Sequence, residues 1–327
     1  MSTDLPPQPS ESSDDNTLSS LTLDLPGHSS GKVREAWVLD DDRRLLVTTD
    51  RISAFDRVIG TVQHKGQVLN QLSAWWFANT ADVVANHVVS VPDPNAMVVV
   101  DATPLPVEVV VRGRLTGSTS TSLLPRYQAG ERVLYGHQLP EGLVAHGPLP
   151  EPLITPTTKA EVGEHDQPVT CEEVVSSGLV EEGLWNEVQK AALALFARGV
   201  TLAANAGFIL ADTKYEFGLT PDGKLIVIDE LHTPDSSRFW EAKSTDALVA
   251  AGANPESFDK EPVRLALKAL GYRGDGEPPE LPAQVRQETS QRYVSLFERM
   301  TGTEFQPGAT PVGSRITNTI AAYQGKR

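Results

Sequence analysis

The sequence predicts an α+β fold whose N-terminal lobe is built mostly from antiparallel strands. Two observations support this prediction. Short β-rich runs separated by turn residues fill the first third of the chain, which is typical of hairpins. Further on, a long helical pattern leads directly into a strand and a second hairpin, and the rest of the chain is helical with proline-rich breaks. The length of 327 residues allows two domains.

The composition indicates a folded protein in a reducing compartment. Hydrophobic residues make up 39% of the chain and there are 25 glycines, which is enough apolar material for a packed core. The single cysteine, Cys171, cannot form an intrachain disulfide or a multi-thiolate metal site. The formal net charge of −15 repels nucleic acid and anionic lipid, so we expect neither as a partner.

No segment of the sequence indicates a membrane or a secretory protein. The longest uncharged apolar stretch near the middle, residues 199–211, is shorter than the ~20 residues that cross a bilayer. The N-terminus lacks the basic start and apolar run of a secretory signal. We expect a cytoplasmic protein, and nothing indicates an obligate protein partner.

Residues 1–28 are expected to form a disordered acidic tail. This stretch contains no Lys or Arg and has little periodic apolar pattern. Ordering it would cost backbone entropy with little burial in return.

Residues 29–106 are expected to form the N-terminal lobe. Residues 32–50 read as two strands around an acidic turn, and residues 65–79 place apolar and aromatic side chains at helical spacing. The aromatic stripe of this helix suits a core better than a ligand site. Two more strands are expected at 96–101 and 107–115.

Residues 107–327 are expected to form a larger C-terminal lobe. The proline-rich stretch 138–166 has few apolar residues in register, and we expect it to be a flap. A helix is predicted over 185–206, with Gly207 as its C-terminal stop, followed directly by the strand 208–219.

That last strand alternates charged and core residues. Side chains two residues apart share a face of a strand, so Asp212, Lys214 and Glu216 project together. The residues between them are apolar or aromatic except Thr213. One face of the strand is therefore ionic and the other belongs to the core.

The next strand brings a further acid to this face. A two-residue Asp222-Gly223 turn would place Glu216 opposite Asp229, and a four-residue loop would place Lys214 opposite Asp229. Either way Asp229 joins the ionic face; only an odd loop or a bulge would move it.

Two carboxylates ~5 Å apart repel by about 3 kcal/mol at an effective dielectric constant near 20. Lys214 supplies one positive charge against Asp212, Glu216 and Asp229. The surplus suits a hard divalent cation, and we interpret the face as a site for Mg²⁺ with a nucleotide. The alternative is a solvated charged face or a structural salt bridge.

Three other segments could bind an anion. Ser236 and Arg238 lie in a short polar turn, and Arg112 lies on a strand that ends shortly before Ser118. An ordinary helix cap would explain the first of these equally well. The segment "SSGKVRE" resembles a phosphate-binding turn, although it has neither GxxxxGK[ST] nor GxGxxG.

Taken together, the motifs resemble the SAICAR synthetase family. The resemblance extends from about Gly31 to Arg264 and keeps the family's order. It rests on "GKVRE", "TDRISAFD", "KGQVLNQLSAWWF", "VVRGRLTGS", "ITPTTKAEVGEHD", "ILADTKYEFG", "DELHTPDSSRFW" and "SFDKEPVR". It implies a ligase of de novo purine biosynthesis that joins carboxyaminoimidazole ribonucleotide to L-aspartate and converts ATP to ADP and phosphate. It also implies two lobes with ATP in the cleft between them, loosely like protein kinases.

The resemblance implies roles for particular residues by matched position. Lys32 and Arg34 would hold the ATP phosphates, which makes the N-terminal lobe the nucleotide-binding one. Glu216 and Asp229 would bind Mg²⁺ and, through it, ATP. Lys214 would lie between the γ-phosphate and the reacting carboxylate.

The substrate side is implied in the same way. The ribonucleotide pocket would be lined by Ser53, Asp56, Arg112, Ser118, Asp212 and Arg238. Arg112, Ser118 and Arg238 would take its phosphate, and Asp212 would share the catalytic role with Lys214. Lys159, on the flap, would be a carboxylate partner.

Other interpretations stay open at this point. The chain could be a nucleotide-binding regulatory paralogue without turnover, although such copies usually lose the charged site residues that are present here. A kinase-like phosphotransferase would need HRD and DFG motifs, which are absent from the sequence. The family commonly has a hydrophobic residue where this chain has His232, so we expect this histidine to pack in the core.

Overall fold

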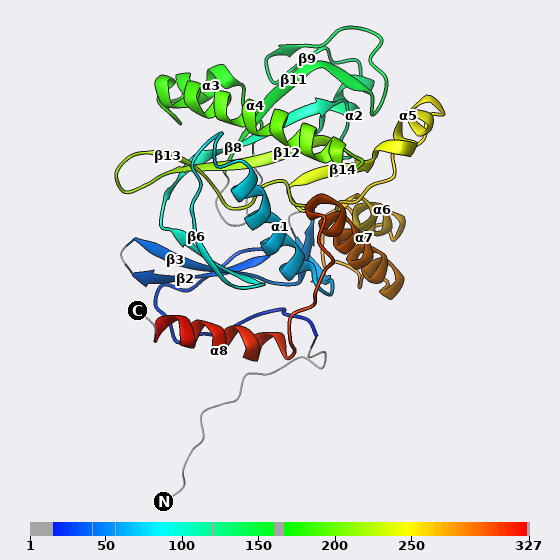
Figure 1. Cartoon of the computed structure of the whole chain (residues 1–327). Coiled ribbons are helices and arrows are strands. Elements are labelled where there is room, and N and C mark those ends of the chain that lie inside the picture. Colours follow the sequence, from blue (N-terminus) through cyan, green and yellow to red (C-terminus); the bar gives the residue numbers. More distant parts are fainter. Residues whose placement is uncertain (1–15, 41, 56, 120, 160–166, 326–327) are drawn as a thin grey trace, which may run out of the picture.

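Two five-stranded antiparallel sheets define the two lobes of the computed structural model (Figure 1). The structure describes residues 16–40, 42–55, 57–119, 121–159 and 167–325. In the N-terminal sheet the strand order is β1 (Ser29–Ser30), β2 (Arg34–Asp40), β3 (Arg43–Thr48), β7 (Ala96–Val100) and β6 (Val88–Asp93).

The second sheet carries the charged strand at its centre. Its order is β11 (Pro148–Thr158), β8 (Thr103–Arg114), β12 (Phe208–Leu219) and β13 (Leu225–Ile228), and β14 (Ser237–Glu241) also pairs with β12. Two small ladders complete the strands: β4 (Arg51–Ala54) with β5 (Arg57–Thr61), and β9 (Val133–Leu134) with β10 (His137–Gln138).

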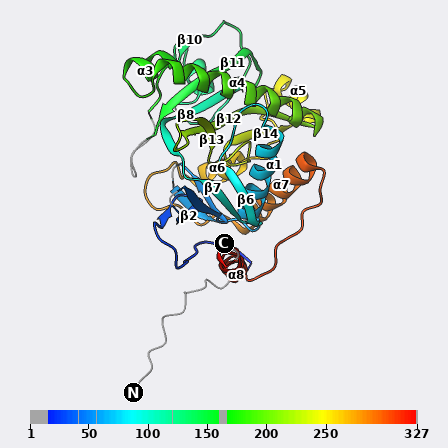
Figure 2. The same ribbon diagram turned by 60° about the vertical axis from the view of Figure 1, so that its left-hand side comes forward.

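The helices cover the sheets and fill the space between them. The long ones are α1 (Lys65–Asn79), α4 (Glu182–Asn205), α7 (Ala283–Thr301) and α8 (Val312–Gln324). The short ones are α2 (Leu123–Gln128), α3 (Cys171–Ser176), α5 (Ala242–Ala250) and α6 (Glu261–Ala269). Helix α4 packs along β12, and α1 lies between the two sheets (Figures 1 and 2).

These elements confirm the predicted fold class. The hairpin of residues 32–50 appears as β2 and β3, and the helix predicted over 65–79 has those bounds. The aromatic stripe of α1 is core, because Trp76 and Phe77 are fully buried beside residues of the second sheet. One hydrophobic core therefore spans both lobes, and the expected lobe boundary at residue 106 falls inside β8.

The predicted flap over residues 138–166 is wrong where the chain forms a strand. Residues 148–158 form β11, which pairs with β8. β11 is an edge strand, and an edge position tolerates prolines because only one side must supply ladder hydrogen bonds. The end of the expected flap, residues 160–166, lies outside the described residues.

The predicted disordered tail ends earlier than residue 28. Residues 1–15 lie outside the described residues, but Leu18 is only 3% exposed and packs with Trp37 and Ile316. The backbone N–H of Leu18 also donates to the Asp50 carboxylate at 2.7 Å. A few leucines without helical or strand periodicity gave no signal that this segment covers a sheet.

Within the described residues, no helix is long and apolar enough to cross a membrane.

Candidate active site

A cleft of about 560 Å³ lies between the two lobes, within the size range of small-molecule sites. The N-terminal lobe lines it with the turn Gly31–Arg34 and with Ser53 to Phe55. The second sheet lines it with charged residues of β8 and β12, and the chain after β13 completes it.

The alternation predicted for β12 is present. Lys214 and Asp212 line the cleft, while Tyr215 is fully buried on the other face. The Lys214 ammonium donates to Glu108 at 2.6 Å and to Glu216 at 3.0 Å. Glu108 lies directly opposite Glu216 on the neighbouring strand β8, so the lysine lies between two facing carboxylates.

These neighbouring charges determine the protonation states of Glu216 and Lys214. Burial opposes the charged form of Glu216, but Lys214 and Lys159 lower the pKa of its carboxyl to about 2. Burial also opposes the charged form of Lys214, but Glu216 and Glu108 raise the pKa of its ammonium above its usual value. Both groups are therefore charged at neutral pH.

The predicted hairpin register is wrong, yet Asp229 reaches the cleft. Glu216 lies opposite Ile228 and Leu219 opposite Leu225, so the loop is an odd one. Regular alternation would turn Asp229 toward the core. Instead, Asp229 comes directly after the last residue of β13 with φ 68, and this left-handed conformation ends the ladder and directs the residue to the cleft.

Asp229 lies in a concentration of negative charge. Its carboxylate pairs with Arg34, whose guanidinium also pairs with the adjacent Glu230. Burial raises the pKa of the Asp229 carboxyl to about 6; Arg34 lowers it, and Glu216 and Glu230 raise it further. The carboxylates of Asp229 and Glu216 thus influence each other electrostatically, although Glu216 is not among the residues that line the cleft.

The carboxylates fit a cation that is bound partly by phosphates. Among the described residues, no three His, Cys, Asp or Glu side chains are arranged as a metal site of their own. Mg²⁺ usually takes one or two protein carboxylates together with phosphate oxygens. Burial in the first place, and then Glu216 and Glu230, raise the pKa of the Asp229 carboxyl, and a bound cation would favour its charged form.

Asp212 joins two arginines. Its Oδ2 accepts from Arg238 at 2.6 Å and from Arg112 at 3.3 Å, and the carboxylate is almost fully buried. Arg112 also donates from Nε to Thr155 at 2.8 Å. Arg238 also lies 4.0 Å from Glu261, and the two guanidinium groups together suit an anionic substrate group.

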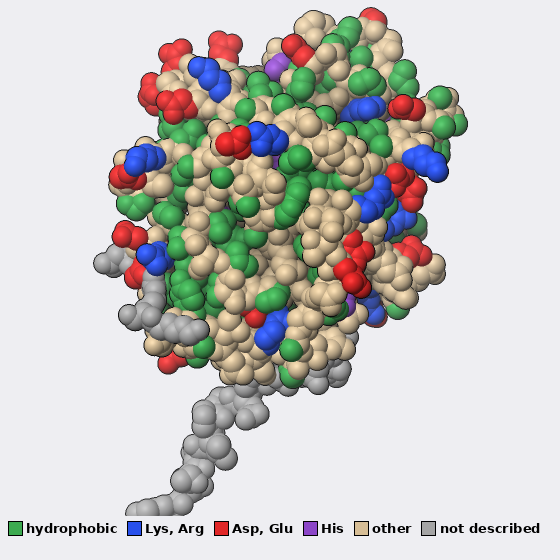
Figure 3. Space-filling view, viewed as in Figure 1, with side chains coloured by type: hydrophobic (Ala, Val, Ile, Leu, Met, Phe, Trp, Pro, Cys, Tyr) green, Lys and Arg blue, Asp and Glu red, His purple; other side chains and the backbone are tan. Residues whose placement is uncertain are grey.

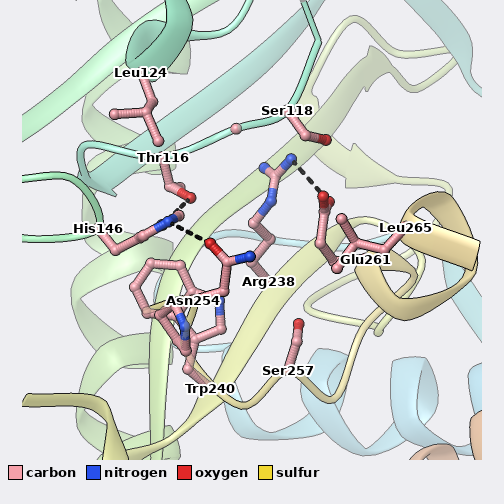
Figure 4. Close-up of a pocket in the computed structure, with 12 residues that line it drawn as sticks. Thr116, Ser118, Leu124, His146, Arg238, Trp240, Asn254, Ser257, Glu261 and Leu265 are labelled. Atoms are coloured by element: carbon pink, nitrogen blue, oxygen red, sulfur yellow. Dashed lines mark hydrogen bonds and ion pairs between the residues drawn. The ribbon is translucent and has the colours of Figure 1, made fainter. Parts of the chain in front are cut away.

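Ser118 lies in a smaller adjoining pocket of about 140 Å³, shown in Figure 4. Arg238 lines this pocket as well as the cleft, so it lies between the two. His146 bridges the walls of the pocket: its ring lies 3.1 Å from Thr116 Oγ1 and 3.1 Å from Asn254 Oδ1. Arg112, Arg238 and Ser118 are thus near one another, as predicted.

The remaining predicted residues divide into three groups. Lys32 and Ser53 line the cleft. Lys159 is not among the residues that line it, and its ammonium pairs with Glu216. Asp56 lies outside the described residues.

Several charged residues that line the cleft were not predicted as site residues: Glu108, Glu230, Asp235, Lys260 and Arg264. Glu108 shares its strand face with Arg112, so the alternation of β8 could have identified it. Lys260 and Arg264 are one helical turn apart in the quoted "SFDKEPVR" motif.

Asp235 forms an ion pair with a lysine that is distant in the sequence, so no local pattern indicates this contact. Lys65, at the start of α1, is fully buried with its Nζ 2.8 Å from Asp235. Lys260 lies 3.5 Å from the same carboxylate, and the Tyr293 hydroxyl donates to it at 2.9 Å. Only the tertiary fold brings these residues together.

Comparison with known proteins identifies the family. Residues 28–280 match a model of the family described as SAICAR synthetase. A protein of Mesorhizobium japonicum, named putative phosphoribosylaminoimidazole-succinocarboxamide synthase 2, is 46% identical over 310 residues, which are 94% of this chain and 99% of the relative. The phosphoribosylaminoimidazole-succinocarboxamide synthase of Legionella pneumophila is 42% identical over 313 residues, with coverages of 94% and 99%.

A solved structure agrees with these relatives. The SAICAR synthase of Saccharomyces cerevisiae, in complex with SAICAR, has a TM-score of 0.75 and 30% identity to this chain. The match covers 89% of this chain and 100% of the yeast one.

Proposed function

The chain belongs to the SAICAR synthetase family, and we propose that the cleft between its two lobes is where the reaction of this family takes place. The activity is an ATP-dependent ligation in purine biosynthesis that yields SAICAR, ADP and phosphate. The substrates to be joined are carboxyaminoimidazole ribonucleotide and L-aspartate. The observation that carries the assignment is Lys214, held between two carboxylates and beside the paired arginines of Asp212.

Joining a carboxylate to an amine requires activation, because a carboxylate oxygen is a poor leaving group. We propose that the γ-phosphoryl group of ATP is transferred to the substrate carboxylate, with cleavage of its bond to ADP. The aspartate nitrogen then attacks the acyl carbon, the bond from that carbon to the phosphate oxygen breaks, and the nitrogen loses a proton. ATP, the ribonucleotide and L-aspartate are all anionic, so cations in the cleft must reduce the repulsion between them.

Lys214 is suited to this task because its charge and position are fixed. Glu216 and Glu108 keep its pKa raised, and both accept hydrogen bonds from its ammonium. A cation held in place needs little reorganisation when charge develops on the transferring phosphoryl group.

Glu216 and Asp229 would hold Mg²⁺ together with the phosphates, while Lys32 and Arg34 would contact the phosphates from the turn of the other lobe. When bound, the ion supplies charge neutralisation for the triphosphate. Arg34 pairs with Asp229 and Glu230 in this structure, so its guanidinium must exchange partners when phosphates enter.

Arg112 and Arg238 would bind the phosphate of the ribonucleotide, with Ser118 at the adjoining pocket. A guanidinium fork matches phosphate geometry. Asp212 would keep the two forks in place.

The direct test is ADP release from ATP with Mg²⁺, with the ribonucleotide and L-aspartate each omitted in turn. We expect turnover only with all components present. A protein that binds ATP without turnover would support the regulatory paralogue instead, and turnover without aspartate would support a phosphotransferase. Substrate with ¹⁸O in its carboxylate should deliver one labelled oxygen to the released phosphate; unlabelled phosphate would exclude the acyl phosphate.

Two sets of variants test the residues. Lys214→Met should lower kcat by about a thousandfold, as loss of one group that stabilises the transition state does. Lys224→Met is the matched control, because Lys224 pairs with Asp222 on the exposed turn of the same hairpin. Glu216→Gln and Asp229→Asn should each raise the Mg²⁺ concentration needed for half-maximal rate, and an unchanged requirement in both would refute the ion's assignment to them.

A further inference from the structure

The turn that carries Lys32 and Arg34 is fastened by an arginine from a different strand. Arg51, the first residue of β4, donates from Nε to the carbonyl of Lys32 at 3.1 Å and from one terminal nitrogen to the carbonyl of Gly31 at 2.8 Å. Its other terminal nitrogen donates to the carbonyl of Ser19 at 2.6 Å. One guanidinium therefore joins the turn to the segment that precedes the sheet.

A buried carboxylate fixes the direction of this guanidinium. Arg51 pairs with Glu35 at 2.5 Å, and Glu35 is only 3% exposed. Glu35 also accepts from the Ser30 hydroxyl at 3.0 Å, and the His28 ring lies 2.8 Å from it. The orientation of Arg51 is thus set by groups on both sides of the turn.

We propose that Arg51 is a positioning residue that holds the turn Gly31–Arg34 in the conformation that binds the ATP triphosphate. The proposal rests on the function proposed above. The planar trans peptide places the N–H groups of Lys32 and Val33 opposite the carbonyls that Arg51 binds. Arg51 therefore sets the direction of two amide donors on a turn that lines the cleft.

Arg51 also connects two parts of the N-terminal lobe that line the cleft. Two residues after it on β4 lies Ser53, which lines the cleft and is expected to contact the ribonucleotide. Any displacement of the turn relative to β4 changes the distance between the groups expected to hold ATP and those expected to hold the ribonucleotide. A fixed link at Arg51 prevents that displacement.

Lysine cannot replace this arginine. The guanidinium has five N–H donors in a rigid plane, and here it serves four carbonyls and one carboxylate at once. The Arg51 side chain is only 12% exposed, although its bonds to the carbonyls of Gly31 and Lys32 lie at the exposed surface of the turn. A lysine would keep the charge beside Glu35 and leave at least one turn carbonyl without its donor.

The test compares Arg51→Lys with Arg44→Lys. Arg44 is an arginine of the same lobe that donates to Asp101 at 2.5 Å and is not among the cleft residues. We expect R51K to raise KM for ATP about tenfold, since loss of one or two hydrogen bonds acts on the turn alone. The KM for L-aspartate should stay within about twofold of the original value, and R44K should change neither constant.

Amide hydrogen exchange provides a readout without ligand or turnover. In R51K, exchange in a peptide covering residues 29–37 should be faster, while exchange in α4 should not change. Added ATP should slow exchange in this peptide in the original protein and do so less in R51K at the same concentration.

Wild-type KM for ATP and wild-type exchange in R51K would overturn the proposal. Equal rises of every KM in both R51K and R44K would also overturn it, because such rises would indicate general destabilisation. If the original protein fails to turn over but ATP still protects residues 29–37, the proposed function fails and the role of Arg51 stands. If ATP gives no protection while turnover is normal, the role of Arg51 fails and the function stands.

Discussion

Asp212 lies between two guanidinium groups, and this environment limits what the residue can do. Its Oδ2 already accepts from Arg112 and Arg238, and its carboxylate is 3% exposed. A carboxylate occupied in this way is better suited to fix two arginines than to accept a proton from substrate. The sequence indicated that Asp212 faces the site, but the pairing with both arginines depends on three strands being adjacent.

Asp212→Asn should therefore weaken ribonucleotide binding more than it slows the chemistry. The amide removes the charge that both guanidinium groups share, so we expect KM for the ribonucleotide to rise at least about tenfold, with a loss of about 3 kcal/mol in stability. Steady-state kinetics and urea unfolding measure the two effects. Asp246→Asn, on an exposed face of α5, is the control. A collapse of kcat with unchanged KM would show instead that Asp212 takes part in the chemistry.

His232 gives a prediction about pH. The ring is fully buried, its Nε2 is 3.3 Å from the Tyr215 hydroxyl, and it lies 4.5 Å from the Trp76 ring, so it packs in the core as expected. Burial lowers the pKa of this imidazole to about 3. As pH falls below 6.5, the unfolded chain takes up a proton here and the folded protein does not.

The stability that neutral His232 contributes is thus fully present above pH 6.5 and is lost progressively toward pH 3. His232→Gln should reduce the slope of unfolding free energy against pH between 6 and 4.5 by up to about 1.4 kcal/mol per pH unit. Urea unfolding at several pH values measures that slope. Parallel curves for the two proteins would show that the histidine is protonated in the folded state.

At the scale of elements, the hairpin β12–β13 shows which structural features an alternating sequence pattern can predict. Alternation correctly placed Lys214 and Glu216 on one face, because the period of two is a property of any strand. It did not determine the loop. The N–H of Thr220 donates to the carbonyl of Lys224, and the N–H of Gly223 donates to the carbonyl of Thr220, which leaves three residues in the loop.

An Asp-Gly pair suits a two-residue turn and also the end of a three-residue loop, where Gly223 adopts φ 80. Local sequence does not separate these possibilities, and the choice shifts every partner on β13 by one position. Local sequence also does not predict the left-handed conformation of Asp229, whose φ of 68 directs the residue to the cleft. The sequence predicted which residues meet, but not the backbone path that brings them together.

The contact between α1 and the end of β3 gives a prediction for an element. A Cβ on Gly66 would lie 2.3 Å from the carbonyl oxygen of Thr48 and 2.8 Å from the carbonyl carbon of Thr49. Both are backbone atoms, so Gly66→Ala must displace the first turn of α1. We expect a loss of about 1–3 kcal/mol in unfolding free energy, as for other overpacked sites.

Gly313→Ala is the matched control in another helix. Its Cβ would meet only side-chain atoms of Leu21 and Leu18, at 3.7 and 3.9 Å. Since alanine favours a helix interior over glycine, we expect a gain of about 0.5–1 kcal/mol. Equal stability of the two variants in urea unfolding would contradict the close approach of α1.

At the scale of the whole molecule, charge is distributed unevenly. The chain carries a formal net charge of −15, and acidic side chains gather on the surface over α3 and the start of α4 (Figure 3). The cleft nevertheless collects arginines and lysines from both lobes. Overall charge therefore does not indicate where small anions can bind, and only the fold shows it.

The two ends of the described chain together cover the outer face of the N-terminal sheet. Leu18 and the buried face of α8 pack with Trp37, Leu45 and Val98 of that sheet (Figure 1). Leu18 and α8 lie outside residues 28–280, which the family model matches. The sheet that carries the turn Gly31–Arg34 thus depends for its burial on segments that the family pattern does not include.

Ile316→Ala should test this dependence without touching the cleft. Ile316 is fully buried in the α8 contact, so its truncation should lower the unfolding free energy by about 2–5 kcal/mol through lost burial and a cavity. Asn318→Ala, on the exposed side of the same helix, should cost less than about 0.5 kcal/mol. Because the cleft residues lie on the other side of the sheet's core, kcat of Ile316→Ala at low temperature should match the original protein, while its activity should be lost at a lower temperature. Equal thermal inactivation of the two variants would mean that α8 rests on the sheet without stabilising it.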